Sequence, residues 1–399
     1  MKTQSPATVK QLVNCIPVHQ LEELAEVTQV NHQVKKLTGD VMFKLLLMSV
    51  LSSEKISLRV MEDLYRSKRF RLIAKLDEEN TTRHTSLSDR LMNIKAEYFE
   101  RLFDATYKQL SRQYSAETIE KHRIIRYDSS CIAASAQLLK TGIISGQPDK
   151  RGVHQLKQIK ISVGFDGLFP KSMKLFSEQK YAGDDEALRE PILASKREKD
   201  EVIVFDRGLK KRKTFAEIDG QKKHFVTRIN PSKTYDVIKS LANVQGKRTA
   251  TLKLISDEKV YLYHEGHLKF KLPFRLIRTC SLQKNHEEIF FLTNIWDMDA
   301  ASITEIYKRR WDIEVFFKFL KQEMNLKHFI SYSENGIKVM LYVILIAAML
   351  IMLYKKLNHL DSFKRAKKLF IEELDTELVK EIVILCGGDP AKSQYLKPV

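Results

Sequence analysis

The chain has 399 residues, of which 43% are hydrophobic, so it can bury one large core or form two to three domains. Its net charge is +18, and its 68 lysine and arginine residues are spread along the whole length. This charge favours a polyanionic partner, because each neutralised phosphate releases counterions; a merely basic soluble protein is the alternative. The four cysteines lack pairing or metal-like spacing, which excludes a zinc site and indicates a reducing cytosol. The amino terminus MKTQSPATVKQLVN lacks the apolar core of a signal peptide.

The first 120 residues are predicted to form a separate, all-helical domain. Apolar residues recur at helical spacing in VMFKLLLMSVLSS, ISLRVMEDLYRSKRF and SLSDRLMNIKAEYFERLFDATYKQL. Ser86 and Asp89 fit a capping box that would open the last of these helices. If that helix entered the major groove of DNA, Arg90 could read bases.

Two later segments each place an aspartate after a predicted strand. RIIRYDSS (Arg123–Ser130) is a short β-rich run that ends in Asp128 and a polar turn. In EVIVFDRG (Glu201–Gly208), four consecutive apolar residues precede Asp206, which is typical of a strand buried on both faces of an α/β sheet. The carboxyl ends of such strands are where ligands usually bind, although either aspartate alone could be a turn or helix-start residue.

The segments around the second aspartate continue this α/β pattern. Residues Lys157–Asp166 and Pro170–Gln179 are predicted to form a hairpin that turns at Asp166-Gly167. DDEALREPILAS and KTFAEIDG read as helices, and HFVTRI (His224–Ile229) reads as a strand. Residues 232–294 are rich in Val, Tyr, Phe, Leu and Thr, so they are predicted to be several inserted strands; a separate β-domain of unrelated function is the alternative.

Residues Ser302–Lys327 are predicted to form one helix, because SITEIYKRRWDIEVFFKFLKQEMNLK contains no glycine or proline and repeats apolar residues at helical spacing. At about 100° per residue, four polar side chains fall within roughly 60° of the helix wheel: Tyr307, Arg310, Glu314 and Lys321. An apolar stripe lies beside them, so one side of the helix can enter a core while the adjoining side presents a carboxylate between cations. A solvated charged helix is the alternative.

The carboxyl-terminal region, residues 332–399, is predicted to be helical and to pack on the core. Val339–Tyr354 carries no charge but is shorter than the about 20 residues that span a bilayer, so we expect a buried central helix. The following segment SFKRAKKLFIEELDTELVKEIVIL is predicted to be a second helix that contributes to dimerisation.

Two strands and one helix that each present a carboxylate predict a metal site. Three converging carboxylates can hold two Mg²⁺ ions about 4 Å apart, and these ions would promote phosphodiester exchange by activating a water or a 3′-hydroxyl. The sequence offers no cysteine or histidine cluster that would compete for the metal.

At this point the sequence resembles the DDE transposases of bacterial insertion sequences. Asp128 in YDSS, Asp206 in FDRG and Glu314 match the DDE pattern. The spacing Tyr307-x2-Arg310-x3-Glu314-x6-Lys321 reproduces the YREK signature of the Tn5-like IS4 family. The resemblance covers about half the chain, residues 123–328.

This resemblance implies a fold and a cofactor. The expected fold is α/β, with an RNase H-like catalytic domain at residues 121–331 that carries the β-rich insertion at about 232–294. Residues 1–120 would be the helical DNA-binding domain. Asp128, Asp206 and Glu314 would hold two Mg²⁺ ions, and Mn²⁺ could substitute.

The residues around Glu314 suit a DNA end. Arg310 and Lys321 could pair with phosphates, Arg310 through a two-pronged contact, and Tyr307 could donate its hydroxyl to another phosphate. Trp296 is a candidate platform for a flipped base, with a core tryptophan as the alternative. The basic residues after Asp206 would line the active-site rim, unless they form only a solvated loop; those retained as DNA-binding candidates are Arg207, Lys210 and Lys211.

The sequence thus predicts a cut-and-paste DNA transposase of an insertion sequence. Its partners would be double-stranded DNA, as terminal inverted repeats and target, and a second copy of the chain when paired ends are bound. The protein would act at the nucleoid in the bacterial cytoplasm, without a membrane. A metal-dependent nuclease of the same fold without strand transfer and an inactive DNA-binding relic remain as alternatives.

Overall fold

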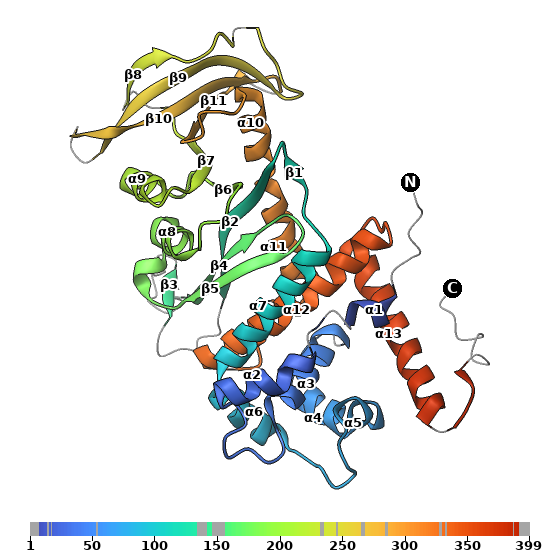
Figure 1. The fold of residues 1–399 in the computed structure, drawn as a ribbon. Coiled ribbons are helices and arrows are strands. Elements are labelled where there is room, and N and C mark those ends of the chain that lie inside the picture. Colours follow the sequence, from blue (N-terminus) through green and yellow to red (C-terminus); the bar gives the residue numbers. More distant parts are fainter. Residues whose placement is uncertain are drawn as a thin grey trace. The chain divides into compact units, whose positions relative to one another are not determined.

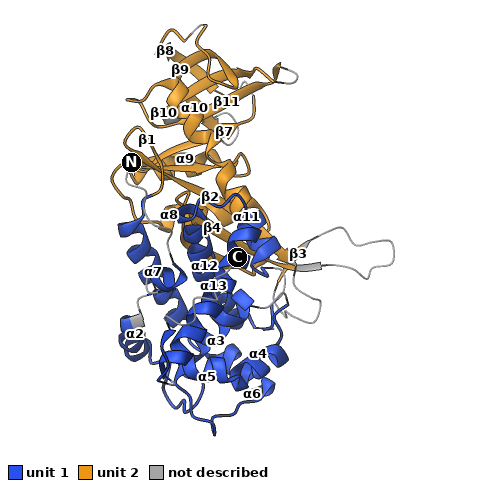
Figure 2. Ribbon diagram, turned by 90° about the vertical axis from the view of Figure 1, so that its right-hand side faces the viewer, with its two compact units in different colours: residues 1–115, 133–140, 317–399 blue, residues 116–132, 141–316 orange. Residues whose placement is uncertain are grey.

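The computed structural model describes residues 8–13, 16, 18–52, 55–133, 142–145, 156–231, 235–244, 246–264, 268–283, 286–326, 329–331, 333–385 and 387–390. The chain divides into two compact units, which Figure 2 shows in different colours. Unit 1 comprises residues 1–115, 133–140 and 317–399, and unit 2 comprises residues 116–132 and 141–316.

The described part of unit 1 is built mainly from helices (Figure 1). In chain order these are α1 (Val9–Val13), η1 (Val18–Gln20), α2 (Leu21–Thr28), α3 (Gly39–Ser52), α4 (Leu58–Arg66), α5 (Lys68–Ala74), α6 (His84–Asn93), α7 (Ala96–Gln113), α12 (Glu334–Leu357) and α13 (Phe363–Leu385). Serine side chains begin several of them: Ser57 caps α4, Ser67 caps α5 and Ser333 caps α12.

The most apolar helix, α12, forms the centre of unit 1. It packs against α3, α6, α7 and α13. Its length and composition would allow it to cross a membrane, but 94% of its most apolar 18-residue window is buried inside the protein. The prediction of a buried central helix is therefore confirmed. The two lysines at its end, Lys355 and Lys356, lie where cations favour the carboxyl-terminal end of a helix dipole.

The predicted helix that opens at Ser86 is wrong in the structure. The segment forms two helices, α6 and α7, because the chain turns at Ile94, which is buried and extended. The Ile94 carbonyl accepts a hydrogen bond from the side chain of Asn335 (2.7 Å) instead of a helical partner. Ser86 lies inside α6, since Arg83 occupies the N-cap position.

The suggestion that Arg90 reads bases also fails. Its guanidinium donates to the carbonyl oxygens of Leu37 (2.8 Å) and Val30 (2.7 Å), so the side chain serves the folding of unit 1.

Unit 2 is organised around one mixed sheet of 11 strands. The strands are β1 (Thr118–Ile119), β2 (His122–Ala133), β3 (Ile143–Ser145), β4 (Leu156–Phe165), β5 (Pro170–Phe176), β6 (Glu201–Phe205), β7 (His224–Ile229), β8 (Tyr235–Ser240), β9 (Leu252–His264), β10 (Leu268–Ser281) and β11 (Glu288–Thr293). The order across the sheet is β3-β4-β2-β6-β7-β11-β10-β9-β8, with β5 beside β4 and β1 beside β2. β2, β6 and β7 are parallel, whereas β11 joins β7 antiparallel. The chain is thus a mixed α/β protein.

Helices cover both faces of the central strands (Figure 1). These are η2 (Gln179–Tyr181), α8 (Asp184–Ala194), α9 (Arg212–Gly220), α10 (Ala300–Lys308) and α11 (Trp311–Glu323). On one face, Ile203 and Phe205 of β6 belong to a cluster with the apolar residues of α8 and α9. On the other, Val202 and Val204 belong to a cluster with α10. The unbroken apolar run of β6 follows from this burial on both faces.

Several predicted elements of unit 2 are confirmed. β4 and β5 form the predicted hairpin, whose turn places Gly167 at φ +101. DDEALREPILA forms α8, and β7 has the predicted bounds. The predicted insertion, residues 232–294, contains β8 to β11, which continue the sheet through β7 and so do not form a sheet of their own; residues 232–234, 245, 265–267 and 284–285 lie outside the described residues. Only the predicted end of the first strand is wrong, because β2 continues past Asp128 to Ala133.

The single helix predicted over Ser302–Lys327 is also wrong. α10 ends at Lys308 and α11 begins at Trp311, while Lys327 lies outside the described residues. Between them the backbone bonds tighten, as the Arg310 N–H donates to the Tyr307 carbonyl (2.9 Å).

A buried arginine of β2 holds this turn in place. The Arg126 Nε donates to the carbonyl oxygen of Arg309 (2.9 Å), and its guanidinium also pairs with Asp312 (2.7 Å). A continuous helix would have committed the Arg309 carbonyl to a helical partner. The helix-wheel angle between Tyr307 and Glu314 therefore does not describe their true arrangement.

Candidate active site

Asp128 and Asp206 lie where two parallel strands end their pairing. The last paired residues of β2 and β6 are Tyr127 and Phe205, and each aspartate follows directly. Because side chains alternate along a strand, both aspartates belong to the face of the sheet that α10 covers. The structure therefore brings together the two aspartates that the sequence singled out.

The pKa of Asp128 is raised to about 6, mainly because the carboxyl group is buried. The negative charge of Asp206 raises it further, while the Ser129 backbone N–H, which donates to Asp128 (2.8 Å), and the charge of Arg310 lower it. This carboxylate is therefore poorly stabilised by its surroundings and would gain from a nearby cation.

The turn after β6 fixes the second aspartate. The Gly208 N–H donates to the Asp206 carboxylate (2.8 Å). A β-carbon on Gly208 would lie 2.8 Å from that carboxylate and 3.0 Å from the carboxylate of Asp184, so glycine is needed for this close approach. Leu209 follows and is buried in the core between the sheet, α8 and α9, which anchors the turn.

Glu314 reaches this region through Arg310. The guanidinium of Arg310, which precedes α11, donates to the carboxylate of Glu314 in the first turn of that helix. Arg310 is mostly buried, and its Nε has no hydrogen-bond partner in the described structure. Burial would lower the pKa of Arg310, but the fields of Tyr307, Glu314 and Asp128 raise it, so the guanidinium stays charged beside the carboxylates.

Tyr307 lies at the end of α10 against the same arginine. Its ring is 5.9 Å from the Arg310 guanidinium carbon and packs edge-to-face on Phe291 (5.3 Å between centroids). Burial is the main reason that the pKa of Tyr307 is raised, so its hydroxyl remains a hydrogen-bond donor.

Asp184 is a fourth carboxylate at this site that the sequence analysis did not identify. As the first residue of α8, it accepts hydrogen bonds from Lys160 Nζ (2.8 Å) and the Ser129 hydroxyl (2.6 Å). Although burial works in the opposite direction, these bonds hold the pKa of Asp184 below its usual range. The acidic start of DDEALREPILA was the available signal, but such residues are common in the first turn of any helix.

The remaining predicted site residues lie in different surroundings. Lys321 is on α11, in the part of the chain that belongs to unit 1. Trp296 follows β11 and is 45% exposed, with the Lys259 ammonium 5.6 Å from its ring centroid, so the alternative of a core tryptophan is wrong. Arg207 and Lys210 are exposed, whereas Lys211 pairs with Glu186.

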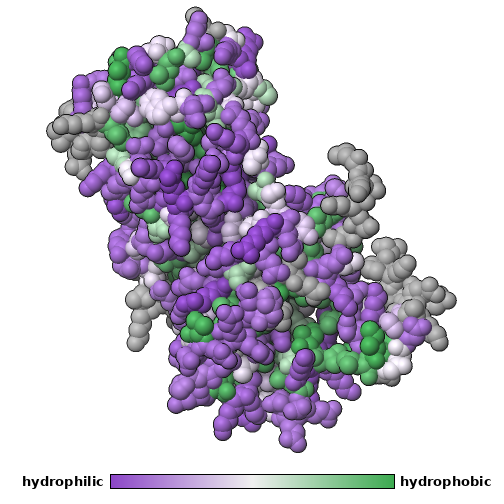
Figure 3. Space-filling model, viewed as in Figure 1, coloured by the Kyte–Doolittle hydropathy of each residue, from purple (hydrophilic) through white to green (hydrophobic). Residues whose placement is uncertain are grey.

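A basic cavity lies beside the Asp206 turn. Its volume is about 230 Å³, and cationic residues dominate its polar lining: Arg207, Lys210, Arg212 and Arg228. Leu209 and Phe215 form part of its wall. Figure 3 shows that hydrophilic side chains cover most of the drawn face of unit 2.

The carboxylates fit a divalent cation chemically. Within the part of the chain that the structure describes, no group of three or more aspartate, glutamate, histidine or cysteine side chains is placed to hold a metal ion. Asp128 and Asp206 nevertheless offer the oxygen ligands that hard cations prefer, and a cation would relieve the repulsion that raises the pKa of Asp128. Glu314 would join them by exchanging Arg310 for the ion.

Two families of known proteins match this chain. The family described as Transposase DDE domain matches residues 119–350, and a domain of unknown function (DUF4372) matches residues 4–74.

Named relatives share parts of the sequence. A protein named as the transposase y4zB of Sinorhizobium fredii is 27% identical over 39% of this chain and 43% of its own length. A protein named as the transposase of insertion sequence element IS4SA, from Synechocystis sp., is 32% identical over 20% of this chain and 21% of its own length. The chain thus spans less than half the length of these relatives. Among solved structures, the piggyBac transposase synaptic complex with hairpin DNA aligns with a TM-score of 0.44 and 13% identity, over 93% of this chain and 81% of that one.

Proposed function

The chain belongs to the Transposase DDE domain family, which matches more than half of its length, and from this premise we propose that it is a cut-and-paste DNA transposase of an insertion sequence. One arrangement carries the proposal: Asp128 and Asp206 are adjacent on the sheet, and Arg310, which pairs with Glu314, also acts on the charge of Asp128. Carboxylates that converge beside a guanidinium suit the handling of a phosphodiester.

The topology supports an RNase H-like core for this enzyme. The strand order β5-β4-β2-β6-β7 combines an antiparallel hairpin with three parallel strands, and helices lie on both faces. The spacing from Tyr307 to Lys321 supports a place in the IS4 family.

A pair of divalent cations, Mg²⁺ or in its place Mn²⁺, would be held by Asp128, Asp206 and Glu314. When bound, the cations supply positive charge that polarises the phosphate and the attacking hydroxyl. Asp184 would act indirectly, because it is engaged by Lys160 and Ser129 and so orients the turn that carries Asp206.

The reaction exchanges one phosphorus–oxygen bond for another at each step. Water first attacks a phosphorus at the transposon end, and the breaking bond leaves a 3′-hydroxyl. That hydroxyl attacks the opposite strand and closes a hairpin, which a second water opens. The free 3′-hydroxyl then attacks a phosphorus of the target DNA.

The side chains beside Glu314 would hold the DNA strand during these steps. Arg310 presents a charged guanidinium with an unpartnered Nε, and Tyr307 presents a protonated hydroxyl, so both can donate to phosphate oxygens. Lys321 would add a point charge further along α11. The exposed Trp296 is our candidate for stacking on a flipped base.

The rest of the chain would bind DNA and assemble the complex. Arg207, Lys210 and Lys211 would contact phosphates at the active-site rim, with Lys211 exchanging Glu186 for DNA. Residues 1–120 would form the domain that binds the terminal inverted repeats, residues 121–331 the catalytic domain, and residues 332–399 a helical region packed on it. We propose a dimer on paired ends, acting at the nucleoid in the bacterial cytoplasm.

The test is cleavage of a plasmid that carries the gene with its native flanks. Wild-type protein is compared with Asp206→Asn and Glu314→Gln, in Mg²⁺ and in EDTA, and the ends are resolved on denaturing gels. Glu178→Gln is the matched control, because Glu178 is exposed and pairs only with Lys180 at the surface.

We expect excision with hairpinned ends in the wild type and the control, and its loss in both site variants and in EDTA. Nicking without excision would instead identify a nuclease without strand transfer. Binding without any cleavage would identify an inactive relic.

A further inference from the structure

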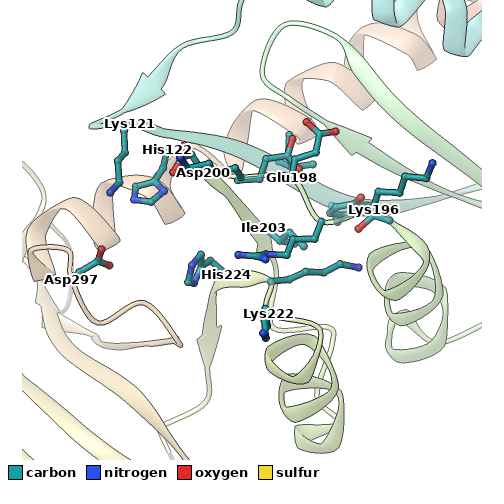
Figure 4. A pocket seen from close by; sticks show the side chains of 16 residues that line it. Lys121, His122, Lys196, Glu198, Asp200, Ile203, Lys222, His224 and Asp297 are labelled. Atoms are coloured by element: carbon teal, nitrogen blue, oxygen red, sulfur yellow. The ribbon is translucent and has the colours of Figure 1, made fainter.

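A second polar cavity lies at the opposite ends of the parallel strands from Asp128 and Asp206. Its volume is about 210 Å³, and it opens where β2, β6 and β7 begin (Figure 4). His122 is the first residue of β2, so at roughly 3.3 Å per residue it lies about 20 Å along the strand from Asp128. The cavity is therefore separate from the carboxylate site, and the proposed transposition chemistry does not use it.

The cavity has a surplus of positive charge. Several of its lining cations form no hydrogen bond or ion pair with other described residues: Lys121, Lys196, Lys199 and Lys222. Two of its acidic residues are already neutralised, since Glu198 and Glu201 each pair with both Arg123 and Lys171. Asp200 and Asp297 remain as the other acidic residues in the lining, so they offset only part of the charge.

Two imidazoles in the cavity lack the partners that buried polar groups normally have. His122 is only 6% exposed, and its Nδ1 is buried without a hydrogen-bond partner. His224, the first residue of β7, also has a buried Nδ1 without a partner. Figure 4 shows both rings lining the same cavity. A buried polar atom without a partner destabilises a protein unless water or a ligand satisfies it, which makes this pair an independent sign of a ligand.

We propose that this cavity binds a phosphate group, with the DNA backbone as its source. The two imidazoles would donate hydrogen bonds to the phosphate from inside the cavity, and Lys196, Lys199 and Lys222 would pair with it from the rim. Lysine and arginine contacts to phosphates position a nucleic acid without reading its sequence. The cavity would thus hold a DNA segment at the far end of the sheet from the carboxylates.

The phosphate site can be tested directly by NMR on the full chain. Protein labelled with ¹⁵N at histidine is titrated with inorganic phosphate at constant ionic strength without divalent cations, while the imidazole signals are followed. The test variant is Lys196→Gln with Lys199→Gln. The matched control is Lys239→Gln with Lys253→Gln, which removes the same charge from exposed positions outside the cavity. The variant His224→Asn probes the interior of the site.

We expect the signals of His122 and His224 to shift together and to saturate in the wild type and the control. Affinity should fall by about tenfold or more in the double lysine variant, because charge-assisted bonds to phosphate are strong. Shifts that never saturate, or that are equal in the test variant and the control, would indicate an adventitious ion only and overturn the proposal.

A second titration distinguishes the source of the phosphate. Adding a duplex of arbitrary sequence should displace inorganic phosphate if the DNA backbone is the ligand, and the salt dependence of DNA binding should weaken by about 0.9 per lost contact. Saturable phosphate binding that DNA does not disturb would assign the cavity to a small phosphorylated ligand and overturn the DNA assignment. Neither measurement depends on cleavage, so failure here is distinct from failure of the proposed transposase activity.

Discussion

Arg310 and Glu314 form an ion pair one helical turn apart, at the point where α10 gives way to α11. The pair ties the carboxylate of the helix to the electrostatic surroundings of Asp128, because the same guanidinium lowers the pKa of Asp128. A phosphate that binds Arg310 would compete with Glu314 for this guanidinium. Binding of DNA and release of Glu314 to a cation would then be linked events.

The first prediction concerns Arg310. Replacing it with alanine should reduce single-turnover cleavage of bound DNA by on the order of 100-fold, because one preorganised charged donor near the reacting phosphate is lost. Arg310→Lys should recover only part of this rate, since lysine keeps the charge but loses the two-pronged geometry. Rapid-quench cleavage with saturating enzyme measures both variants. Cleavage by Arg310→Ala at the wild-type rate would contradict the proposed role.

The second prediction concerns pH and Asp128. Its pKa is about 6 in the folded protein and about 3.9 when exposed, so between these values the native state binds more protons than the unfolded state. Stability should therefore fall as pH rises from about 4 to 6 in EDTA. Asp128→Asn should remove this dependence and raise the free energy of unfolding at pH 7 by roughly 2 kcal/mol, while abolishing cleavage.

Urea unfolding at several pH values measures this effect. At pH 4 the variant and the wild type should have nearly equal stability, and Mg²⁺ at pH 7 should stabilise the wild type more than the variant. A variant that is less stable than the wild type at pH 7 in EDTA would refute the electrostatic account.

The third prediction concerns the turn after β6. Gly208→Ala should lower the cleavage rate by about 100-fold, because the new methyl group would displace the Asp206 and Asp184 carboxylates that lie within 3.0 Å of it. Gly220→Ala is the matched control, since nothing lies within 4 Å of its added β-carbon. Cleavage rates and thermal unfolding are compared for both variants. Equal activity of the two would mean that this close approach has no catalytic importance.

The fourth prediction concerns the buried arginine that holds the α10–α11 turn. Arg126→Met should destabilise unit 2 by about 3 kcal/mol, because it leaves Asp312 and the carbonyl oxygens of Ile124, Asp166 and Arg309 without their donor. Asp312→Asn should cost only about 1 kcal/mol, since its side chain is partly exposed and the carbonyls keep their partner. Urea unfolding gives both values, and equal losses would show that the carbonyl contacts contribute little.

Much of the secondary structure was predictable because local patterns decide it. The apolar run of EVIVF, the Asp166-Gly167 turn and the uncharged stretch of α12 each allow one favourable local conformation, and the structure confirms them. The helix boundaries were less predictable. The breaks at Ile94 and Arg309 depend on Asn335 and Arg126, which are distant in the sequence and compete for backbone groups that a helix would otherwise use.

The residues of the candidate site divide in the same way. The sequence by itself determined the basic character of the chain, its family and the carboxylates Asp128, Asp206 and Glu314, because residue type and spacing carry that information. Only the tertiary structure decided that Asp184 joins them, that Trp296 is exposed, and that two histidines share a cavity at the far end of the strands. These relationships arise from the parallel pairing of β2, β6 and β7, which brings together residues far apart along the chain.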